Sequence, residues 1–350
     1  MKFIHIADVH LGALPDAGKA YSKERGKELW ETFAKVIQIC EEEKVDFLFI
    51  AGDFFHRQPL KKELKEVNYY FSKLSQTRVI LIAGNHDYVK SDSQYHNFPW
   101  NDNVYFLIEE NPKCLVFEDV ATSVTGFSYK NREIKEPKYD VIVPKKHAKY
   151  EVLIAHGGDE KHIPIKREYL EKVGFDYIAL GHIHKPQILV ENKAAYAGAL
   201  EPIDRNDTGK HGYIKGEITR NGTKICFVPL AKREYKHFIF PIKRDMTNAS
   251  IKEALIKIVE KYGQQNMYKF ILRGTRDPEI ELDTESMDVM GNILEVVDET
   301  IPDYDFEKLA LQNQDNLIGA YIQAFEGCEE GSIEYEALCE GVHALMENRR

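Results

Sequence analysis

Residues 79–87 read VILIAGNHD, an apolar run of the length of a buried strand that ends in a glycine and three polar side chains. The same order appears in FLFIAGD at residues 47–53. In open α/β sheets, functional sites form in the crevice beyond the carboxyl ends of the strands. The two stretches therefore predict neighbouring strands whose polar ends lie close together.

Three more stretches follow the same pattern, namely FIHIADVH at 3–10, VLIAHGG at 152–158 and YIALGHIH at 177–184. Residues two apart on an extended chain project to the same side, so a D-x-H or H-x-H pair presents two donors to one region. A single such residue at a strand end is usually a turn or hydrogen-bonding residue. Five strand ends of this kind in order predict a shared metal site.

The candidate ligands combine carboxylate, amide and imidazole groups and include no thiolate. They are Asp8, His10, Asp53, Asn85, His156, His182 and His184. Such a set suits Mn, Fe or Zn, and Mn²⁺ is our first choice. A carboxylate can bridge two divalent ions, and Asp53 is the best candidate for that bridge. Two metals roughly 3.5–4 Å apart can clamp a phosphate and lower the pKa of a bound water from 15.7 to about 7.

The first 235 residues alternate short apolar runs with amphipathic stretches, which predicts a domain of the α/β (α+β) class. Apolar residues recur at helical spacing in two segments, Leu29 to Cys40 and Leu60 to Leu74, so both are expected to pack on a sheet. Residues 100–235 are rich in Val, Ile, Phe and Tyr with Gly, Asn and Pro at the breaks, which favours hairpins and a second sheet. We expect a two-sheet sandwich flanked by helices.

The remaining chain predicts two smaller parts. Residues 236–305 are expected to form a small α+β domain, with a helix near 248–262, a strand at 267–272 and another helix that starts near Thr284. Residues 306–350 are expected to be a helical tail with Ser332 as a cap. One apolar stripe runs along its last helix, made of Tyr335, Leu338, Val342 and Leu345. The stripe fits either docking of a protein partner or packing on its own domain.

Charge is distributed unevenly over the chain of 350 residues, whose formal net charge is −10. Residues 241–350 carry 11 basic and 23 acidic residues, whereas the first 240 carry 36 basic and 34 acidic residues. The acidity is thus a property of the last third. Bulk charge neither supports nor excludes DNA binding by the first part, where attraction to phosphate would come from local basic groups and bound metal.

Five cysteines without a C-x-x-C pair argue against a disulfide framework and against a thiolate zinc site. The hydrophobic content of 43% is enough for a sizeable core. The sequence contains no leader-like start and no apolar run of about 20 residues, so we expect a cytoplasmic protein with no membrane contact.

At these motifs the sequence resembles the calcineurin-like metallophosphoesterase superfamily, with D-x-H, G-D, G-N-H-D, H and G-H-x-H in order. Within it, DVHLG at 8–12, GDFFH at 52–56 and GHIHKP at 181–186 resemble the SbcD-type nuclease subunits of DNA double-strand-break repair. The resemblance is strong over the first 200 residues. It continues loosely through YAGA at 196–199, where the family usually has Gly-Ser, and into the segment after 236, where the family places its DNA-capping domain.

The resemblance implies the metallophosphoesterase fold and a division of the ligands between two ions. Asp8, His10, Asp53 and His184 would hold one ion, and Asp53, Asn85, His156 and His182 the other. His86 would be the catalytic histidine that does not bind metal, oriented by Asp87, with a contribution of about 10² to 10⁴ in rate. His56 matches a family histidine near the scissile phosphate. A solvated histidine at the start of a loop is its alternative interpretation.

The activity implied by the resemblance is metal-dependent hydrolysis of DNA, as a 3′ to 5′ exonuclease on duplex ends and an endonuclease. Its other implications are an SbcC-type ABC ATPase partner and a homodimer. The candidate DNA contacts are Arg57, Lys61, Lys62, Lys185 and Arg205. Basic residues on a helix are usually a solvated face, so for each of these the alternative is a role in solubility alone.

Two competing functions fit the same motifs. One is a metallophosphodiesterase or phosphatase that acts on a phosphoester other than DNA, since the metal motif is shared by all of these enzymes. The other is a scaffold that recognises DNA ends without cutting them. The extra domain at 236–305 favours a role on DNA, and the intact ligand positions favour catalysis.

Overall fold

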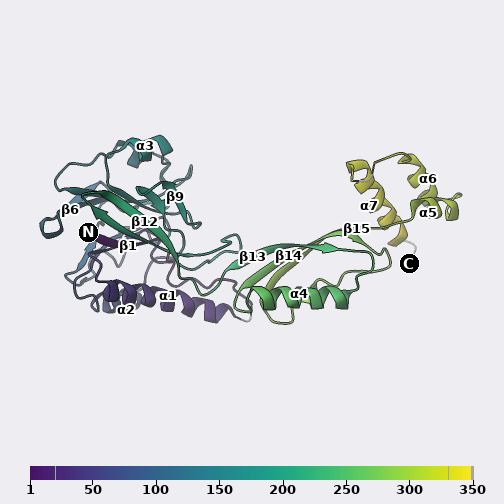
Figure 1. Cartoon of the computed structure of the whole chain (residues 1–350), viewed down its shortest axis with the longest axis horizontal. Helices are drawn as coiled ribbons and strands as arrows, with labels where there is room; N and C mark the ends of the chain where they lie inside the picture. Colours follow the sequence, from purple (N-terminus) through teal and green to yellow (C-terminus); the bar gives the residue numbers. More distant parts are fainter. Residues whose placement is uncertain (20, 330, 348–350) are drawn as a thin grey trace. The chain divides into compact units, whose positions relative to one another are not determined.

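The computed structural model describes residues 1–19, 21–329 and 331–347, which belong to two compact units, Met1–Glu234 and Tyr235–Arg350 (Figure 1). The first unit contains two six-stranded sheets, and the second contains a three-stranded sheet. Each unit is described by itself below.

The first sheet of the first unit has the order β12-β11-β1-β2-β3-β4. Its strands are β1 (Lys2–Ile6), β2 (Phe47–Ala51), β3 (Arg78–Ile82), β4 (Val104–Phe106), β11 (Gly212–Thr219) and β12 (Gly222–Pro229). Strands β1 to β4 run parallel, and β11 joins β1 antiparallel as one arm of a hairpin with β12. The parallel arrangement brings the ends of β1, β2 and β3, with the motifs that follow them, to one edge.

The expected second sheet is present, with the order β5-β6-β7-β8-β10-β9. Its strands are β5 (Lys113–Phe117), β6 (Thr122–Gly126), β7 (Tyr150–His156), β8 (Tyr177–Gly181), β9 (Gln187–Val190) and β10 (Ala194–Tyr196). Antiparallel pairing occurs at β5/β6 and β9/β10, whereas β6, β7, β8 and β10 are parallel. The expectation of hairpins in this region is therefore correct only at the sheet edges. The central strands are joined by long connections, such as the one between β7 and β8 that contains α3 (Arg167–Lys172), and such connections allow parallel pairing.

Alternation along the strands explains how the layers are packed. Phe3, Phe47 and Phe49 point into the space between the sheets, where they meet second-sheet residues such as Ile154 and Tyr177. The other face of the first sheet is covered by α1 (Ser22–Glu43) and α2 (Lys61–Phe71), whose apolar positions from Leu29 to Cys40 and from Leu64 to Phe71 are buried. Of the predicted stripe from Leu60 to Leu74, Leu60 precedes α2 and is 47% exposed, and Leu74 is buried just after its end. The outer face of the second sheet packs with α3. The result is the predicted sandwich flanked by helices.

The second unit begins with three parallel strands, β13 (Tyr235–Ile242), β14 (Met267–Arg276) and β15 (Ile293–Pro302). Helix α4 (Asn248–Tyr262) matches the predicted helix and buries Ile251, Leu255 and Val259 in the core of this unit. Its N-cap Thr247 accepts a hydrogen bond from the backbone N–H of Ser250, which satisfies one of the free amides at the helix start.

The predicted helix near Thr284 is wrong. A single 3₁₀ turn, Glu285–Met287, stands there, and the chain continues into β15. The carboxylate of Asp288 accepts hydrogen bonds from the N–H groups of Gly291 and Ile293, at 2.8 and 3.2 Å, and thereby ends the turn. The β-branched residues that follow pair with β14, which outweighs the local helix signal.

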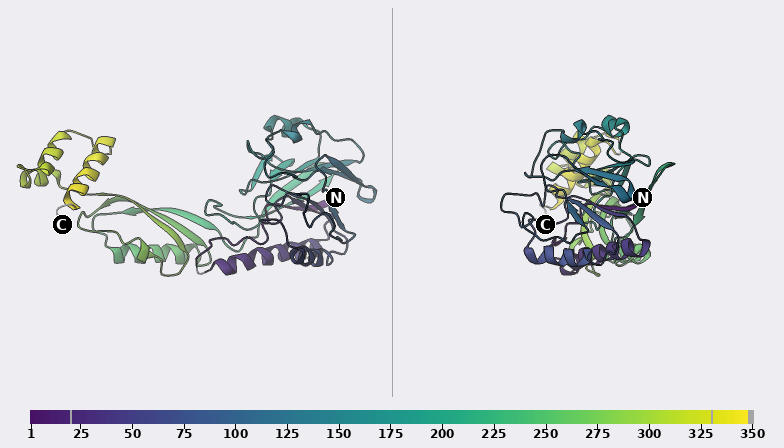
Figure 2. Two further views of the ribbon diagram at one scale, coloured as in Figure 1. Left: turned by 180° about the vertical axis from the view of Figure 1, so that it is seen from behind. Right: turned by 90° about the vertical axis from the view of Figure 1, so that its left-hand side faces the viewer.

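The tail is helical over residues 306–329 and 331–347, as predicted, with α5 (Phe306–Gln312), α6 (Leu317–Ala324) and α7 (Ile333–Glu347), drawn in yellow in Figure 2. Residues 330 and 348–350 of the predicted tail lie outside the described residues. The Ser332 hydroxyl accepts a hydrogen bond from the N–H of Tyr335. Leu338 and Val342 of the apolar stripe are buried against Ile318 and Ile322 of α6. Of the two interpretations of the stripe, packing within its own unit is therefore the one that the structure supports for these two residues.

The described helices include none that is both long and apolar enough to cross a membrane. The five cysteines, all within the described ranges, are free thiols, as their spacing predicted.

Leu338→Ala should loosen the packing of α7 on α6. Truncating a buried leucine costs about 2–5 kcal/mol, so hydrogen exchange of the α6 amides should accelerate. Ile333→Ala is the matched control, because Ile333 lies on the same helix and is 81% exposed. Equal exchange rates of α6 in both variants would contradict the packing described here.

Candidate metal centre

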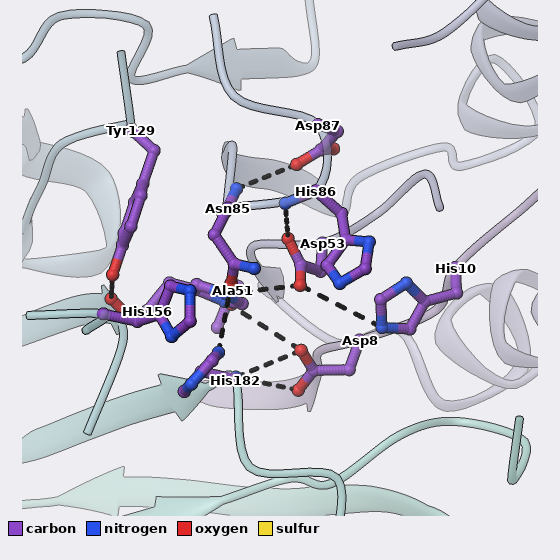
Figure 3. A network of polar contacts seen from close by, with 12 residues as sticks. Asp8, His10, Ala51, Asp53, Asn85, His86, Asp87, Tyr129, His156 and His182 are labelled. Atoms are coloured by element: carbon purple, nitrogen blue, oxygen red, sulfur yellow. Dashed lines mark hydrogen bonds and ion pairs between the residues drawn. The ribbon is translucent and has the colours of Figure 1, made fainter. Parts of the chain in front are cut away.

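The seven candidate ligands lie together at the carboxyl ends of β1, β2, β3, β7 and β8. All of them except His184 are labelled in Figure 3. Three of them, Asp8, His10 and Asp53, have left-handed backbones with φ of 48°, 49° and 47°. This conformation costs a residue with a side chain roughly 1–2 kcal/mol. Hydrogen bonds between the turns hold it, since the N–H of Asp8 donates to Gly52 O and the N–H of His10 to Asp53 O. Such strain is typical of sites where side chains must be aimed at a ligand.

The first cluster consists of Asp8, His10 and His184, whose ligand atoms all lie within 4.8 Å of one another. The Nε2 atoms of His10 and His184 are 3.1 Å apart, and the Nε2 of His10 is 4.0 Å from Oδ2 of Asp53. Asp8 is fully buried, and both of its carboxylate oxygens accept from the N–H of His182. The group is therefore a compact set of two imidazoles and two carboxylates.

The second cluster consists of Asp53, His156 and His182, with Asn85 among them. Nε2 of His156 lies 3.4 Å from Oδ2 of Asp53 and 2.9 Å from Oδ1 of Asn85. Nδ1 of His182 lies 3.1 Å from the same Asn85 oxygen. Because one oxygen of Asp53 approaches both His156 and His10, this carboxylate stands between the two clusters.

The chemistry of the second cluster requires a cation. Nδ1 of His156 donates to the carbonyl of Ala51 at 2.9 Å, so a neutral imidazole presents a lone pair at Nε2. That lone pair faces the Asn85 amide oxygen and the Asp53 carboxylate, which are also acceptors. Three acceptors at such distances repel one another unless a proton or a metal ion lies among them. A divalent metal fits the oxygen and nitrogen donors present.

The pKa shifts in the centre go in both directions. Burial lowers the pKa of His10 well below its usual value and that of His182 to about 4, whereas other groups keep charge more readily. Burial would by itself lower the pKa of His156, but Asp53 and Asp8 raise it to about 9. Burial likewise opposes a raised pKa at His184, which the hydrogen bond to Asp207 and the charge of Asp8 nevertheless bring to about 9. Burial raises the pKa of Asp8 to about 6. Although burial would raise the pKa of Asp53, the neighbouring His156 and His10 hold it well below its usual value.

His86 and His56 line the open side of the first cluster. Their rings are stacked with centroids 5.1 Å apart, and the His86 ring is 4.9 Å from the ring of His10. The Nδ1 of His86 donates to the backbone carbonyl of His56 at 3.1 Å, and the backbone N–H of His86 donates to Asp53 at 2.8 Å. His56 is exposed, whereas His86 is half-buried. Both predicted catalytic histidines thus lie where a substrate could reach them.

Asp87 occupies a different position from the one expected. Its buried carboxylate accepts hydrogen bonds from the N–H of Gly84 at 2.8 Å, from the N–H of Phe55 at 3.3 Å and from the hydroxyl of Tyr95 at 2.8 Å. These bonds hold the turns after β2 and β3 against each other. The ring of His86 is oriented by the carbonyl of His56 instead, so direct orientation of His86 by Asp87 is an expectation that these hydrogen bonds do not support.

Several groups that support the site were not predicted from the sequence. Tyr129 donates to the carbonyl of His156, the N–H of His156 donates to the hydroxyl of Tyr139, and Tyr196 donates to the carbonyl of Gly157. Asp159 and Asp207 contact the two histidines of the G-H-x-H turn. Asp159 follows β7 by three residues, so its position near the site could have been inferred, whereas Asp207 lies in a loop with no strand signal before it.

The five candidate DNA contacts differ in their surroundings. The Arg57 guanidinium is paired with the carboxylate of Glu63 through two hydrogen bonds of 3.0 and 2.7 Å, so its charge is largely balanced. Lys61, Lys62, Lys185 and Arg205 are exposed. Lys185 directly follows the ligand candidate His184, which makes it the basic residue nearest in sequence to the clusters.

Gly52→Ala should disturb the metal centre through His156. A Cβ at Gly52 would lie 2.4 Å from Nδ1 of His156, and the backbone φ is +85°. The imidazole must therefore move, and we expect Mn²⁺ affinity measured by titration calorimetry to fall at least about tenfold. Gly222→Ala is the control, because its φ of +105° is also strained but no atom lies within 4 Å of the added Cβ. Equal Mn²⁺ affinities of the two variants would contradict this geometry.

Comparison with known proteins places these features in a family. Residues 1–186 match the family Calcineurin-like phosphoesterase. The chain is 30% identical over 304 residues to the metallophosphoesterase YhaO of Bacillus subtilis, a match that covers 79% of this chain and 72% of YhaO. It is 29% identical over 282 residues to the DNA double-strand break repair protein Mre11 of Methanocaldococcus jannaschii, covering 74% of this chain and 73% of that protein.

The Mre11 protein of Archaeoglobus fulgidus is 27% identical over 297 residues, which cover 75% of this chain and 64% of that protein. The matched residues 1–186 contain all seven side chains of the two clusters together with His56 and His86. The chain belongs to the calcineurin-like phosphoesterase family and is a metal-dependent hydrolase.

Proposed function

We propose that this hydrolase is a DNA nuclease of the SbcD type, which cuts phosphodiester bonds during DNA repair. The proposed activities are 3′ to 5′ exonuclease action on duplex ends and endonuclease action. The observation that carries the proposal is the position of Asp53 between two clusters of nitrogen and oxygen donors, which suits a pair of ions on one phosphate. The relatives named as DNA double-strand break repair proteins favour DNA as the substrate.

The proposed ligand sets follow the two clusters. Asp8, His10 and His184 would hold one ion with Asp53, and Asn85, His156 and His182 would hold the other with Asp53. Mn²⁺ is proposed because the donors are oxygen and imidazole nitrogen with no thiolate. When bound, two such ions would neutralise charge on the phosphate and lower the pKa of the attacking water.

His86 is proposed to give a proton to the leaving oxygen. The hydrogen bond from its Nδ1 to the carbonyl of His56 keeps the hydrogen on that nitrogen. The transferred proton would therefore leave from Nε2 of the doubly protonated ring, which becomes neutral with its remaining hydrogen on Nδ1. The backbone N–H of His86 donates to Asp53, which ties the position of the ring to the proposed bridging carboxylate. His56, stacked on His86 and exposed, is proposed to contact the scissile phosphate.

Recognition of the DNA backbone is proposed to rely on exposed cations of the first unit, Lys61, Lys62, Lys185 and Arg205, with a smaller contribution from the paired Arg57. The small sheet of the second unit, β13 to β15, would act as the DNA-capping domain. An SbcC-type ATPase, a homodimer and a cytoplasmic location stay predictions. Because Leu338 and Val342 pack on α6, exposed tail residues such as Leu311, Leu317 and Ile333 are the apolar groups left for an ATPase.

With Mn²⁺ present, the protein should shorten an end-labelled DNA duplex, and His86→Ala should slow the cleavage by about 10² to 10⁴. The variant should keep its Mn²⁺ affinity, because His86 lies outside both proposed ligand sets. His147→Ala, at an exposed position, is the control that should cut like the unmodified protein. Gel electrophoresis of the labelled strand measures the rates.

Two outcomes of that assay would reject the DNA assignment. Hydrolysis of simple phosphodiesters without any cleavage of DNA would indicate an enzyme for another phosphoester. Mn²⁺-dependent DNA binding without hydrolysis of any phosphoester would indicate a non-cutting scaffold for DNA ends.

Lys185→Ala should weaken DNA binding with little change in kcat. Loss of one phosphate contact should reduce the salt dependence of log K by about one, as measured by fluorescence anisotropy with labelled duplex DNA at several salt concentrations. Lys172→Ala, an exposed lysine at the end of α3, is the matched control. If the DNA affinities of the two variants depend on salt in the same way, Lys185 does not contact the DNA backbone.

A further inference from the structure

The two histidines of the G-H-x-H turn face the metal centre through different ring nitrogens. In His184 the Nε2 lies 3.1 Å from Nε2 of His10, and the Nδ1 lies 3.1 and 3.2 Å from the carboxylate oxygens of Asp207. In His182 the arrangement is reversed, because Nδ1 faces Asn85 at 3.1 Å and Nε2 contacts Asp159 at 2.7 Å. Each ring therefore has one nitrogen directed into the centre and the other on a carboxylate.

We infer that Asp207 and Asp159 are positioning residues that set opposite tautomers in His184 and His182 and so select the nitrogen each ring offers to a metal. This inference depends on the ligand sets proposed above. An ionised carboxylate only accepts hydrogen bonds, so the ring nitrogen that faces it must carry the hydrogen. The other nitrogen of a neutral ring then has a free lone pair directed at the metal position.

Opposite tautomers are needed because the two histidines are only two residues apart on one turn. Their backbones are fixed by the turn, in which the N–H of His182 donates to Asp8. A ring with the wrong tautomer would direct an N–H at the proposed ion and would have to rotate to bind it. Fixing each ring in advance removes that cost from metal binding.

Asp207 is held firmly from several sides. Its Oδ2 also accepts the N–H groups of Ile203 and Asp204, both at 3.0 Å, and its side chain is 10% exposed. The start of this loop is anchored by Glu201, a buried carboxylate that accepts from the Thr32 hydroxyl of α1 at 2.6 Å. The position of His184 is thereby tied to the core of the first unit.

Further bonds strengthen the anchor at Glu201. The carboxylate accepts the N–H of Lys232 at 2.7 Å and lies 3.6 Å from the guanidinium of Arg25, which is itself completely buried. Removing one partner of a buried ion pair is strongly destabilising, so this loop has little freedom to move. Asp207 is therefore the more rigid of the two positioning carboxylates.

Asp159 is held more loosely. Its side chain is 46% exposed, and it is shared with the ring of His162, whose Nδ1 lies 2.9 Å from Oδ1. Water can replace a partly exposed acceptor at little cost. The structure therefore predicts unequal effects, with a larger loss when Asp207 is removed than when Asp159 is removed.

The test uses the full chain and Mn²⁺ alone, with affinities from titration calorimetry at one pH. Asp207→Ala should bind Mn²⁺ about 10- to 100-fold more weakly than the unmodified protein, and Asp159→Ala only a few-fold more weakly. Asp207→Asn and Asp159→Asn should lose less than the alanine variants, because an amide oxygen still accepts the ring N–H. The matched controls are Asp204→Ala and Glu160→Ala, which remove the same charge next to each site.

A second measurement separates positioning from a general loss of charge or structure. In protein loaded with diamagnetic Zn²⁺ and labelled with ¹⁵N, the ring shifts of His184 should report metal at Nε2 and hydrogen at Nδ1, and those of His182 the reverse. In Asp207→Ala the His184 signals should shift toward a mixture of forms. Thermal unfolding of each variant identifies any loss of affinity that comes from misfolding, and Asp207→Asn keeps the size of the side chain.

The inference would be overturned if Asp207→Ala and Asp204→Ala had the same Mn²⁺ affinity. It would also be overturned if His182 and His184 bound metal through the same ring nitrogen. Calorimetry requires no DNA, so a protein that binds Mn²⁺ as described but cuts no DNA would contradict the proposed substrate and leave this inference intact. A protein that cuts DNA while Asp207→Ala keeps full affinity would overturn the inference alone.

Discussion

One constraint governs the site in the first unit. At the carboxyl ends of its strands, hydrogen-bond acceptors are buried without enough hydrogen-bond donors to pair with them. Asp8, Asp53 and His156 are all buried, and burying charge without a partner is costly. A cation between them turns the same groups from mutual repulsion to attraction. This requirement explains the left-handed backbones of Asp8, His10 and Asp53 and the glycines next to them in the turns. These turns allow residues after five strands to direct their side chains toward the same metal position.

The parts of the site that could be predicted from sequence are those attached to strand ends. An apolar run fixes a strand, and parallel pairing of β1, β2 and β3 and of β7 and β8 then brings the residues after each run together. The position of Asp207 could not be predicted, because it depends on a loop that is anchored through a long-range hydrogen bond from Thr32 of α1 to Glu201. The expected helix near Thr284 failed because pairing with β14 is a long-range interaction that local spacing does not reveal. The hydrogen bonds of Asp87 go to the turns after β2 and β3 and to Tyr95, and not to the ring of His86, because sequence neighbours need not share contacts.

The arrangement also divides the work between layers of residues. Five of the seven groups that would hold metal are buried, and His182 and His184 are partly exposed, whereas His56 and the basic side chains proposed to meet DNA are exposed. Carboxylates, tyrosine hydroxyls and the carbonyl of Ala51 surround the proposed ligands. They form hydrogen bonds with the backbone of the histidines and with the ring nitrogens that face away from the metal position. These bonds hold the histidines in place before a ligand binds, while the exposed ring of His56 next to His86 leaves that side accessible.

The most direct test of this account is anomalous X-ray diffraction from crystals grown with Mn²⁺. The account predicts two manganese peaks roughly 3.5–4 Å apart, with Asp53 in contact with both. The first peak should lie among Asp8, His10 and His184, and the second among Asn85, His156 and His182. A single peak, or manganese bound away from Asp53, would contradict the shared carboxylate on which the proposed chemistry rests.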